Sequence, residues 1–197
     1  MKQHAPATQR NREPIAAILA QELPASGTVL EVASGTGEHA VWFAARFTHL
    51  LWQPTDHDEA AIASIATWRE EAGLPNLLAP CRLDASSTKW PLDKAAAIFC
   101  CNMIHISPVD VTRGLMAGAG RILGEGAPLI CYGPFIETDV PTAPSNLAFD
   151  QSLRAREAQW GLRELAWLDQ LAGAAGLART RRMAMPANNL MLVYRKL

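Results

Sequence analysis

The sequence predicts an α/β fold built on a doubly wound, mostly parallel sheet of seven strands. First, short apolar runs alternate with amphipathic helical stretches between residues 28 and 135. Such alternation is typical of parallel strands joined by right-handed crossovers, with helices on both faces of the sheet. Second, two strand-like runs close the chain and indicate a terminal antiparallel pair. Third, 197 residues with 49% hydrophobic and 19% charged side chains suit one globular domain with its own core.

Each element follows from a local pattern. The first helix is expected at 11–24, with Asn11 as its capping residue and Pro14 near its first turn. In the helix expected at 58–73, Asp58 is the N-cap and Gly73 lies at the C-terminal stop. Further helices are expected at 37–47, 108–123 and 164–176. The expected strands are 28–33, 49–54, 76–83, 95–104, 127–135, 178–185 and 189–196.

The domain organisation is expected to be simple, with one domain over residues 1–197 and an N-terminal helical segment over residues 1–26. The regular rhythm breaks at residues 133–162, where a loop and a helix are longer than a crossover connection requires. Long insertions in compact domains are often binding loops or lids. This insertion is therefore a candidate substrate lid.

Composition narrows the possible partners and location. The formal net charge is −1, and the basic residues form no long run, so nucleic acid is not an expected partner. No signal-peptide core or membrane-length apolar stretch is present, and we expect a cytoplasmic protein without a membrane partner. The four cysteines lie in strand-like segments without a Cys-x-x-Cys pair, which favours reduced, buried thiols and no metal site. Oligomeric state is left open.

A glycine-containing turn follows the first strand. Gly35 and Gly37 precede a helix and let a ligand approach the backbone there, and with Ala40 they also satisfy a loose dinucleotide fingerprint. Glu31, just before the turn, discriminates between cofactors. Its carboxylate would repel a pyrophosphate but can hold an ammonium group. His39, in the first turn of the next helix, is expected to cover the turn, and contact with a bound cofactor is the alternative.

Two further acids follow the second and third expected strands. Asp56 lies about 20 residues beyond the glycine turn, where a carboxylate can accept both hydroxyls of a ribose, and Asp84 can meet an adenine edge. The carboxyl ends of parallel strands meet at one edge of the sheet, so these acids should gather with Glu31. An ammonium, a ribose and an adenine together make up S-adenosylmethionine, which also carries a sulfonium cation.

At these residues the sequence resembles the class I S-adenosylmethionine-dependent methyltransferases. More narrowly, it resembles the methyltransferase-like protein 26 family, also described as domain of unknown function 938. The segments that carry the narrower resemblance are RNREPI at Arg10, LEVASGTGEHAVWFA at Leu30, WQPTD at Trp52, NMIHI at Asn102, YGPF at Tyr132, SNLAFDQSLR at Ser145, WGLRE at Trp160 and MPANNLMLVYR at Met185. They extend over nearly the whole chain.

The resemblance implies a seven-stranded methyltransferase sheet and a cofactor site without an assigned substrate. The implied cofactor residues are Glu31, Ala33, Ser34, Gly35, Gly37, Asp56, Leu83, Asp84 and Asn102. Thr55 replaces a serine of the relatives and keeps the hydroxyl. The fourth strand ends in CCNMIHI instead of the NPPY-type tetrapeptide of amino-directed nucleic-acid methyltransferases, which weakens that substrate class.

The reacting groups should follow the fourth and fifth strands. Asn102 can hold a ligand through its amide, His105 can act as a base near neutral pH, and Tyr132 can line a methyl channel. Exposed polar segments that belong to the resemblance are candidate walls of a substrate pocket. Their residues are Arg10, Asn11, Ser145, Asn146, Arg154, Asn188 and Asn189.

The sequence therefore predicts an enzyme that transfers a methyl group from S-adenosylmethionine to a small molecule, giving S-adenosylhomocysteine. Two alternatives stay open. A non-enzymatic module could keep the nucleoside pocket and serve a protein partner. An NAD(P)-dependent oxidoreductase could use the same glycine turn, although Glu31 and the lack of a Tyr-x-x-x-Lys pair argue against it.

Overall fold

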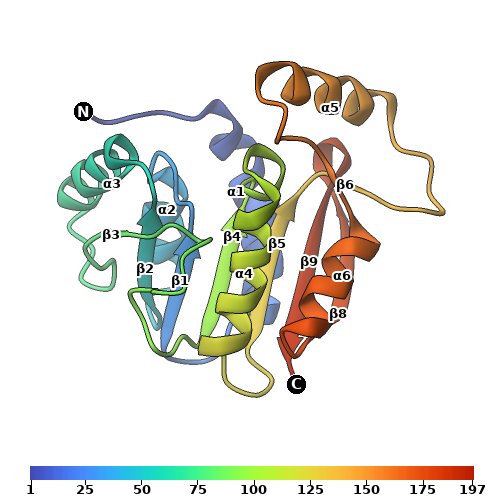
Figure 1. The fold of residues 1–197 in the computed structure, drawn as a ribbon. Coiled ribbons are helices and arrows are strands. Elements are labelled where there is room, and N and C mark those ends of the chain that lie inside the picture. Colours follow the sequence, from blue (N-terminus) through green and yellow to red (C-terminus); the bar gives the residue numbers. More distant parts are fainter.

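The computed structural model describes residues 1–197 and confirms the predicted sheet (Figure 1). Its seven strands are ordered β3-β2-β1-β4-β5-β9-β8. Strands β1 to β5 pair in parallel, and β9 is antiparallel to both β5 and β8. The bounds are β1 (Thr28–Val32), β2 (Leu51–Asp56), β3 (Cys81–Arg82), β4 (Ala97–Cys101), β5 (Pro128–Gly133), β8 (Leu177–Met185) and β9 (Asn189–Lys196). A separate two-stranded pair consists of β6 (Phe135–Ile136) and β7 (Arg163–Glu164).

Helices cover both faces of the sheet. Their bounds are α1 (Pro6–Glu22), α2 (Glu38–Arg46), α3 (Glu59–Ala72), α4 (Val109–Ile122), α5 (Pro144–Arg156) and α6 (Leu165–Ala174), with short 3-10 helices η1 (Ile104–Ile106) and η2 (Pro186–Asn188). In Figure 1, α4 and α6 lie in front of the sheet, and α1 and α2 lie behind it. None of the helices combines the length and the hydropathy of a transmembrane segment.

The two faces bury two different cores. Alternate residues of β1 point to opposite sides, so Val29 packs with α1 and α2, while Leu30 packs with α4 and α6. Phe43, Trp52 and Phe99 form an aromatic cluster in the core behind the sheet. Since β1 is buried on both faces, its position is fixed by packing from both sides.

The start of the first helix was predicted wrongly. Helix α1 begins at Pro6, so Asn11 is an internal helical residue and not the N-cap, and Pro14 lies within the helix. The backbone N–H of Ala5 donates a 2.6 Å hydrogen bond to Glu38 at the start of α2. This contact spans 33 residues and fixes the chain just before Pro6, which then occupies a favoured first-turn position. The local periodicity of the sequence cannot predict this long-range contact.

The third strand is also shorter than predicted. Only Cys81–Arg82 form β3, and the earlier part of the expected strand makes an isolated bridge between Leu77 and Trp52. Pro80 interrupts the ladder because proline has no backbone N–H to donate. The caps predicted for the 58–73 helix are confirmed, since Asp58 accepts from the N–H of Ala60 and Gly73 is left-handed with φ 60°.

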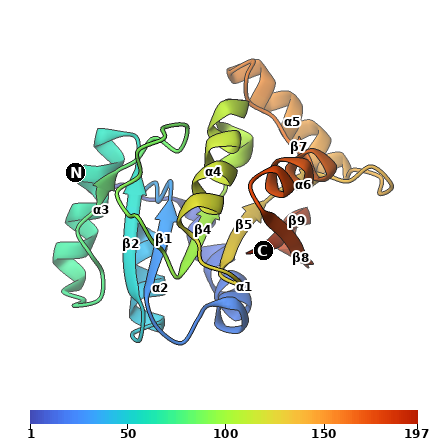
Figure 2. The ribbon, with the colours of Figure 1, turned by 60° about the horizontal axis from the view of Figure 1, so that its bottom comes forward.

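The sheet topology creates a crevice at one edge. Strand β1 lies between β2 and β4, so the strand order reverses there, and the carboxyl ends of the three strands face the same side. The N-terminal segment runs across this edge, and α5 projects beyond it at the other end (Figures 1 and 2). Within α5 only Asn146 and Leu153 are buried. The insertion therefore lies largely outside the core.

Candidate functional site

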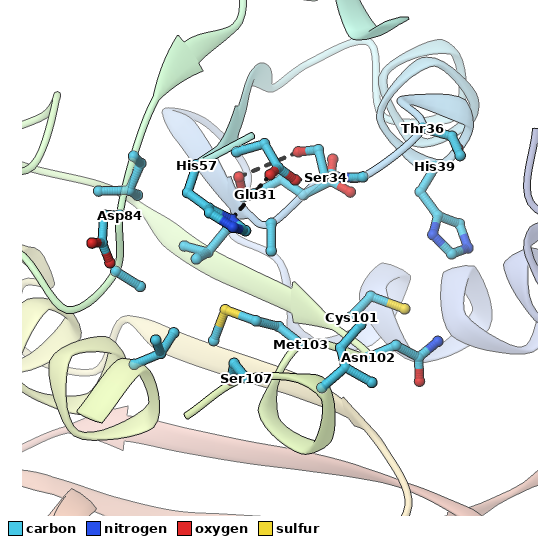
Figure 3. A pocket seen from close by; sticks show the side chains of 18 of the residues that line it. Glu31, Ser34, Thr36, His39, His57, Asp84, Cys101, Asn102, Met103 and Ser107 are labelled. Atoms are coloured by element: carbon cyan, nitrogen blue, oxygen red, sulfur yellow. Dashed lines mark hydrogen bonds and ion pairs between the residues drawn. The ribbon is translucent and has the colours of Figure 1, made fainter. Parts of the chain in front are cut away.

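A cavity of about 710 Å³ opens at the carboxyl edge of β1, β2 and β4. Its wall comes from the start of α1, the turn between β1 and α2, the ends of β2 and β4, the segment after β3 and the start of α4. Trp160, in the insertion, completes the lining. Figure 3 shows Asp84 at one end, Glu31 and Ser34 between, and His39 and Asn102 at the other end. The size is in the range of small-molecule sites.

The structure brings all the predicted cofactor residues except Gly37 into this lining. The lining members of that set are Glu31, Ala33, Ser34, Gly35, Asp56, Leu83, Asp84 and Asn102. Gly37 instead lies at the start of α2 with φ 91°, and a Cβ there would stand 2.9 Å from the Cα of Ile65 in α3. Gly37 thus permits close packing of α2 against α3.

The turn after β1 is shaped for backbone contact with a ligand. Gly35 has φ 56°, and a Cβ added to it would meet nothing within 4 Å. Its N–H donates a 2.9 Å hydrogen bond to Oδ2 of Asp56, which ties the turn to the end of β2. Ala33 and Asn102 also have positive φ, at 58° and 59°, an uncommon conformation for residues with a side chain. Backbone strain on both sides of one cavity is typical of functional sites.

Glu31 lies at the base of the cavity and is only 1% exposed. Its Oε2 accepts a 2.6 Å hydrogen bond from Nε1 of Trp52. Burial raises the pKa of Glu31 to about 8, the Trp52 hydrogen bond opposes the shift, and the nearby Asp56 charge adds to it. At neutral pH the carboxyl therefore holds its proton for most of the time, and an adjacent cation would favour its ionised form.

Two further acids of the lining come from the end of β2 and from the segment after β3. Asp56 is buried, and its Oδ1 accepts from the N–H of Asp58 at 3.0 Å. Asp84 is exposed, and hydrogen bonds from the hydroxyl and the N–H of Ser86 hold its pKa below the usual range. Together with Glu31 and Asp110, these two residues supply all the carboxyl groups of the cavity lining. No lysine or arginine lines the cavity. The cavity therefore favours cationic or uncharged ligand groups.

Of the three predicted reaction residues, only Asn102 lines the cavity. His105 is buried below α5, with its ring 5.6 Å from that of Phe149, and burial lowers its pKa to about 4. Tyr132 is buried in the core behind the sheet, and burial raises its pKa. His105 follows β4 and Tyr132 lies near the end of β5, as expected, but their side chains pack beside the cavity instead of forming its wall.

The predicted substrate residues divide between two places. Asn11 lines the main cavity, whereas Asn146 and Asn188 line a second one of about 130 Å³. Asn146 donates from Nδ2 to the carbonyl of Asn188 at 2.9 Å, and Asn188 donates to Oγ of Ser145 at 3.1 Å. These contacts tether α5 to the η2 turn.

The remaining predicted substrate residues do not line the main cavity. Asn189 donates to the carbonyl of Pro186 and stabilises the η2 turn. Arg154 pairs with Asp150 within α5 at 2.8 Å, and Arg10 is exposed on α1.

Sequence reasoning gave no ligand role to several lining residues. They include Thr8, Met103, Ser107 and Trp160. His39 had a usable signal, because it follows the glycine turn by two residues, and contact with the cofactor was an alternative to covering the turn. Ser107 had none, since the bend at η1 brings it to the cavity. Its hydroxyl is buried without a hydrogen-bonding partner and is thus free for a ligand.

The same fold occurs in solved methyltransferase structures. An O-methyltransferase family protein from Burkholderia thailandensis matches with a TM-score of 0.81 and 14% identity, over 96% of this chain and 56% of that one. An O-methyltransferase family 2 protein from Planctomyces limnophilus, in complex with apigenin, matches with a TM-score of 0.76 and 18% identity, over 97% of this chain and 62% of that one. The SAH-bound form of CalO1, a methyltransferase in calicheamicin biosynthesis, matches with a TM-score of 0.75 and 17% identity, over 96% of this chain and 56% of that one.

The fold of this chain thus corresponds to the Rossmann-like fold of these methyltransferase structures. The chain spans little more than half the length of several of these neighbours. The chain belongs to the family described as protein of unknown function (DUF938), whose model matches residues 2–196.

Proposed function

We propose that this protein is an S-adenosylmethionine-dependent methyltransferase that acts on a small-molecule acceptor. The observation that carries the proposal is the cavity itself, in which Glu31, Asp56 and Asp84 stand in order around an open glycine turn. The resemblance to the methyltransferase-like protein 26 family is part of this proposal, and the DUF938 match supports it.

The residues present fit the cofactor group by group. The space beside Gly35 is where a Cβ would project, so a ligand can lie against the backbone there. Asp56 would accept the ribose hydroxyls, Asp84 would meet the adenine edge, and Glu31 would hold the ammonium. When bound, the cofactor supplies an electrophilic methyl group on a sulfonium.

The charges of the lining favour this cofactor over a nicotinamide dinucleotide. A pyrophosphate brings two negative charges to the turn, where it would meet the Asp56 carboxylate and a Glu31 carboxyl that it cannot ionise, without a lysine or arginine to offset its charge. S-adenosylmethionine brings an ammonium and a sulfonium against one carboxylate. The carboxylate of the ligand can be held by neutral donors such as Thr8, Ser107 and Asn102.

The other lining residues support a small acceptor. Apolar side chains of Met103, Ile106, Val111 and Trp160 share the wall with the polar groups, as is usual in small-molecule sites. The formal net charge of −1 offers no broad basic surface for nucleic acid.

Calorimetric titration with S-adenosylhomocysteine tests the cofactor proposal. We expect micromolar binding by the wild type and at least a roughly 30-fold loss in Asp56→Asn, because two charge-assisted hydrogen bonds of about 1–2 kcal/mol each are weakened. Asp93→Asn, an exposed acid away from the cavity, is the matched control and should bind like the wild type. Absence of wild-type binding, or tighter binding of NADH, would contradict the proposal.

A further inference from the structure

A polar pair at the α1–α2 wall of the cavity has no role in the cofactor proposal. Asn11 comes from α1 and His39 from the first turn of α2, and both line the cavity. Nε2 of His39 lies 2.8 Å from Oδ1 of Asn11. Figure 3 shows the His39 ring at the same end of the cavity as Asn102 and Cys101, away from Asp84.

The ring of His39 is held in one orientation. It stacks on Phe43 with a centroid distance of 5.2 Å and an interplanar angle of 8°. Asn11 is itself buried, and its presence partly offsets the rise that burial causes in the pKa of Tyr132. Because an amide oxygen can only accept, Oδ1 of Asn11 accepts this hydrogen bond from Nε2–H of His39. Nδ1 then keeps its lone pair and makes no hydrogen bond within the protein.

The surroundings keep this imidazole neutral. Burial lowers the pKa of His39 to about 4, Glu38 on its own helix opposes the shift, and Arg12 on α1 adds to it. The other titratable groups on this side are Tyr132 of β5 and Cys101 of β4, whose pKa values are both raised by burial, so both are neutral. An unprotonated Nδ1 is therefore available throughout the physiological pH range.

We propose that His39, oriented by Asn11, is a catalytic residue that accepts the proton of a hydroxyl-bearing methyl acceptor. The inference rests on the proposed function and deepens it by naming the acceptor class. The acceptor oxygen forms a bond to the methyl carbon through its lone pair, and the bond between that carbon and the sulfonium sulfur breaks. The released electron pair stays on sulfur, and the hydroxyl proton moves to Nδ1 of His39.

A hydroxyl acceptor matches the chemistry of a neutral, weakly basic imidazole. The O–H becomes strongly acidic as the oxygen donates its lone pair, so a weak base already in its unprotonated form suffices. A thiol is more acidic than a hydroxyl and can attack as a thiolate, so it depends less on a proton acceptor in the site. A carboxylate or phosphate acceptor would face a lining whose carboxyl groups have no lysine or arginine beside them.

The competing role for His39 is to hold the carboxylate of the cofactor. In that role the imidazole would be protonated in the complex, and its removal would weaken cofactor binding. As a proton acceptor it is neutral in the complex, and its removal leaves cofactor affinity unchanged. The two roles therefore differ in measurements that need no acceptor.

The experiment compares the wild type, His39→Asn and the matched control His49→Asn, an exposed histidine outside the cavity. Calorimetry with S-adenosylhomocysteine should give affinities for all three within about three-fold. NMR of ring-¹⁵N-labelled histidine, assigned with His39→Asn, should show only Nε2 protonated in the complex at pH 7. A ten-fold weaker affinity in His39→Asn, or an imidazolium at pH 7, would overturn the proposal.

The third measurement of this experiment is the rate of methyl transfer. With tritium-labelled S-adenosylmethionine and an extract of small metabolites supplemented with apigenin, wild type and His49→Asn should label hydroxyl compounds. His39→Asn should label them at least 100-fold more slowly, as expected for loss of a proton acceptor. Equal labelling by His39→Asn, or wild-type labelling absent from hydroxyl compounds, would overturn the inference. A wild type that does not bind S-adenosylhomocysteine would instead refute the cofactor proposal.

Discussion

The β1–β2–β3 end of the cavity and the insertion at residues 133–162 are built by different means. At the first, the backbone N–H of Gly35 donates to the side-chain carboxylate of Asp56 at the ends of buried parallel strands. In the insertion, α5 is held by side-chain contacts, such as that between Asn146 and the η2 turn, and most of its residues are exposed. Sheet topology therefore fixes the end of the cavity at which we propose the cofactor binds, while long-range polar contacts hold the insertion.

This difference predicts where substitutions affect stability and where they affect ligand binding. Changes at the buried strand ends should alter the free energy of unfolding or the cofactor affinity strongly. Changes in the polar contacts of α5 should have small global effects and leave cofactor affinity intact.

Glu31→Gln should produce the largest effect, and it should depend on pH. With the pKa of Glu31 raised to about 8, the native state keeps a proton that the unfolded state loses above its own pKa near 4.5. Wild-type stability therefore falls as pH rises from about 4.5 to 8, and glutamine avoids this loss. Between pH 5 and 8.5 the variant should gain on the order of 4 kcal/mol over wild type.

Urea unfolding of both proteins at the two pH values measures the Glu31 effect. Asp93→Asn, which removes an exposed acid, serves as the control and should show little change of this kind. A stability difference between Glu31→Gln and wild type that is independent of pH would show that burial does not hold the proton on Glu31.

The two glycines of the turn provide a matched pair. Gly37→Ala should destabilise the fold by about 3 kcal/mol or more, because the new Cβ meets the backbone of Ile65 at a left-handed φ. Gly35→Ala should cost only about 1–2 kcal/mol, since its Cβ enters open space. That Cβ should instead weaken S-adenosylhomocysteine binding at least ten-fold. Thermal unfolding measures the stability of the two variants, and calorimetry measures their binding. Equal losses of stability in both variants would contradict the different roles predicted for Gly35 and Gly37.

Asn146→Ala should act locally. It removes a buried hydrogen bond to the carbonyl of Asn188 and should cost about 1–2 kcal/mol. Amide hydrogen exchange should rise in α5, while exchange in β1 and β4 and the affinity for S-adenosylhomocysteine stay as in wild type. Faster exchange in β1 would mean that the insertion is part of the main cooperative unit.

Arg154→Ala should give the smallest effect. Its ion pair with Asp150 is solvent-exposed, so we expect a loss of about 0.5 kcal/mol or less, further reduced by salt. Urea unfolding at low and high salt measures it. A change above about 2 kcal/mol would indicate that Arg154 has a structural role beyond the exposed ion pair.

The sequence predicted the parts whose structure is local or set by topology. Asp58 and Gly73 flank their helix as expected, and Glu31, Asp56 and Asp84 meet because parallel strands end at one edge. The start of α1 depends on the distant Glu38 and could not be read from periodicity. His105 follows β4 as expected, but the bend at η1 and the packing of α5 determine where its ring lies.

The position of the cofactor is the central claim, and a crystal structure of the complex with S-adenosylhomocysteine tests it most directly. The account predicts ribose hydroxyls on Asp56, the adenine beside Asp84, the ammonium on Glu31 and the imidazole of His39 free of the ligand carboxylate. A ligand bound elsewhere, for example beside α5, or one with its ammonium turned away from Glu31, would contradict it.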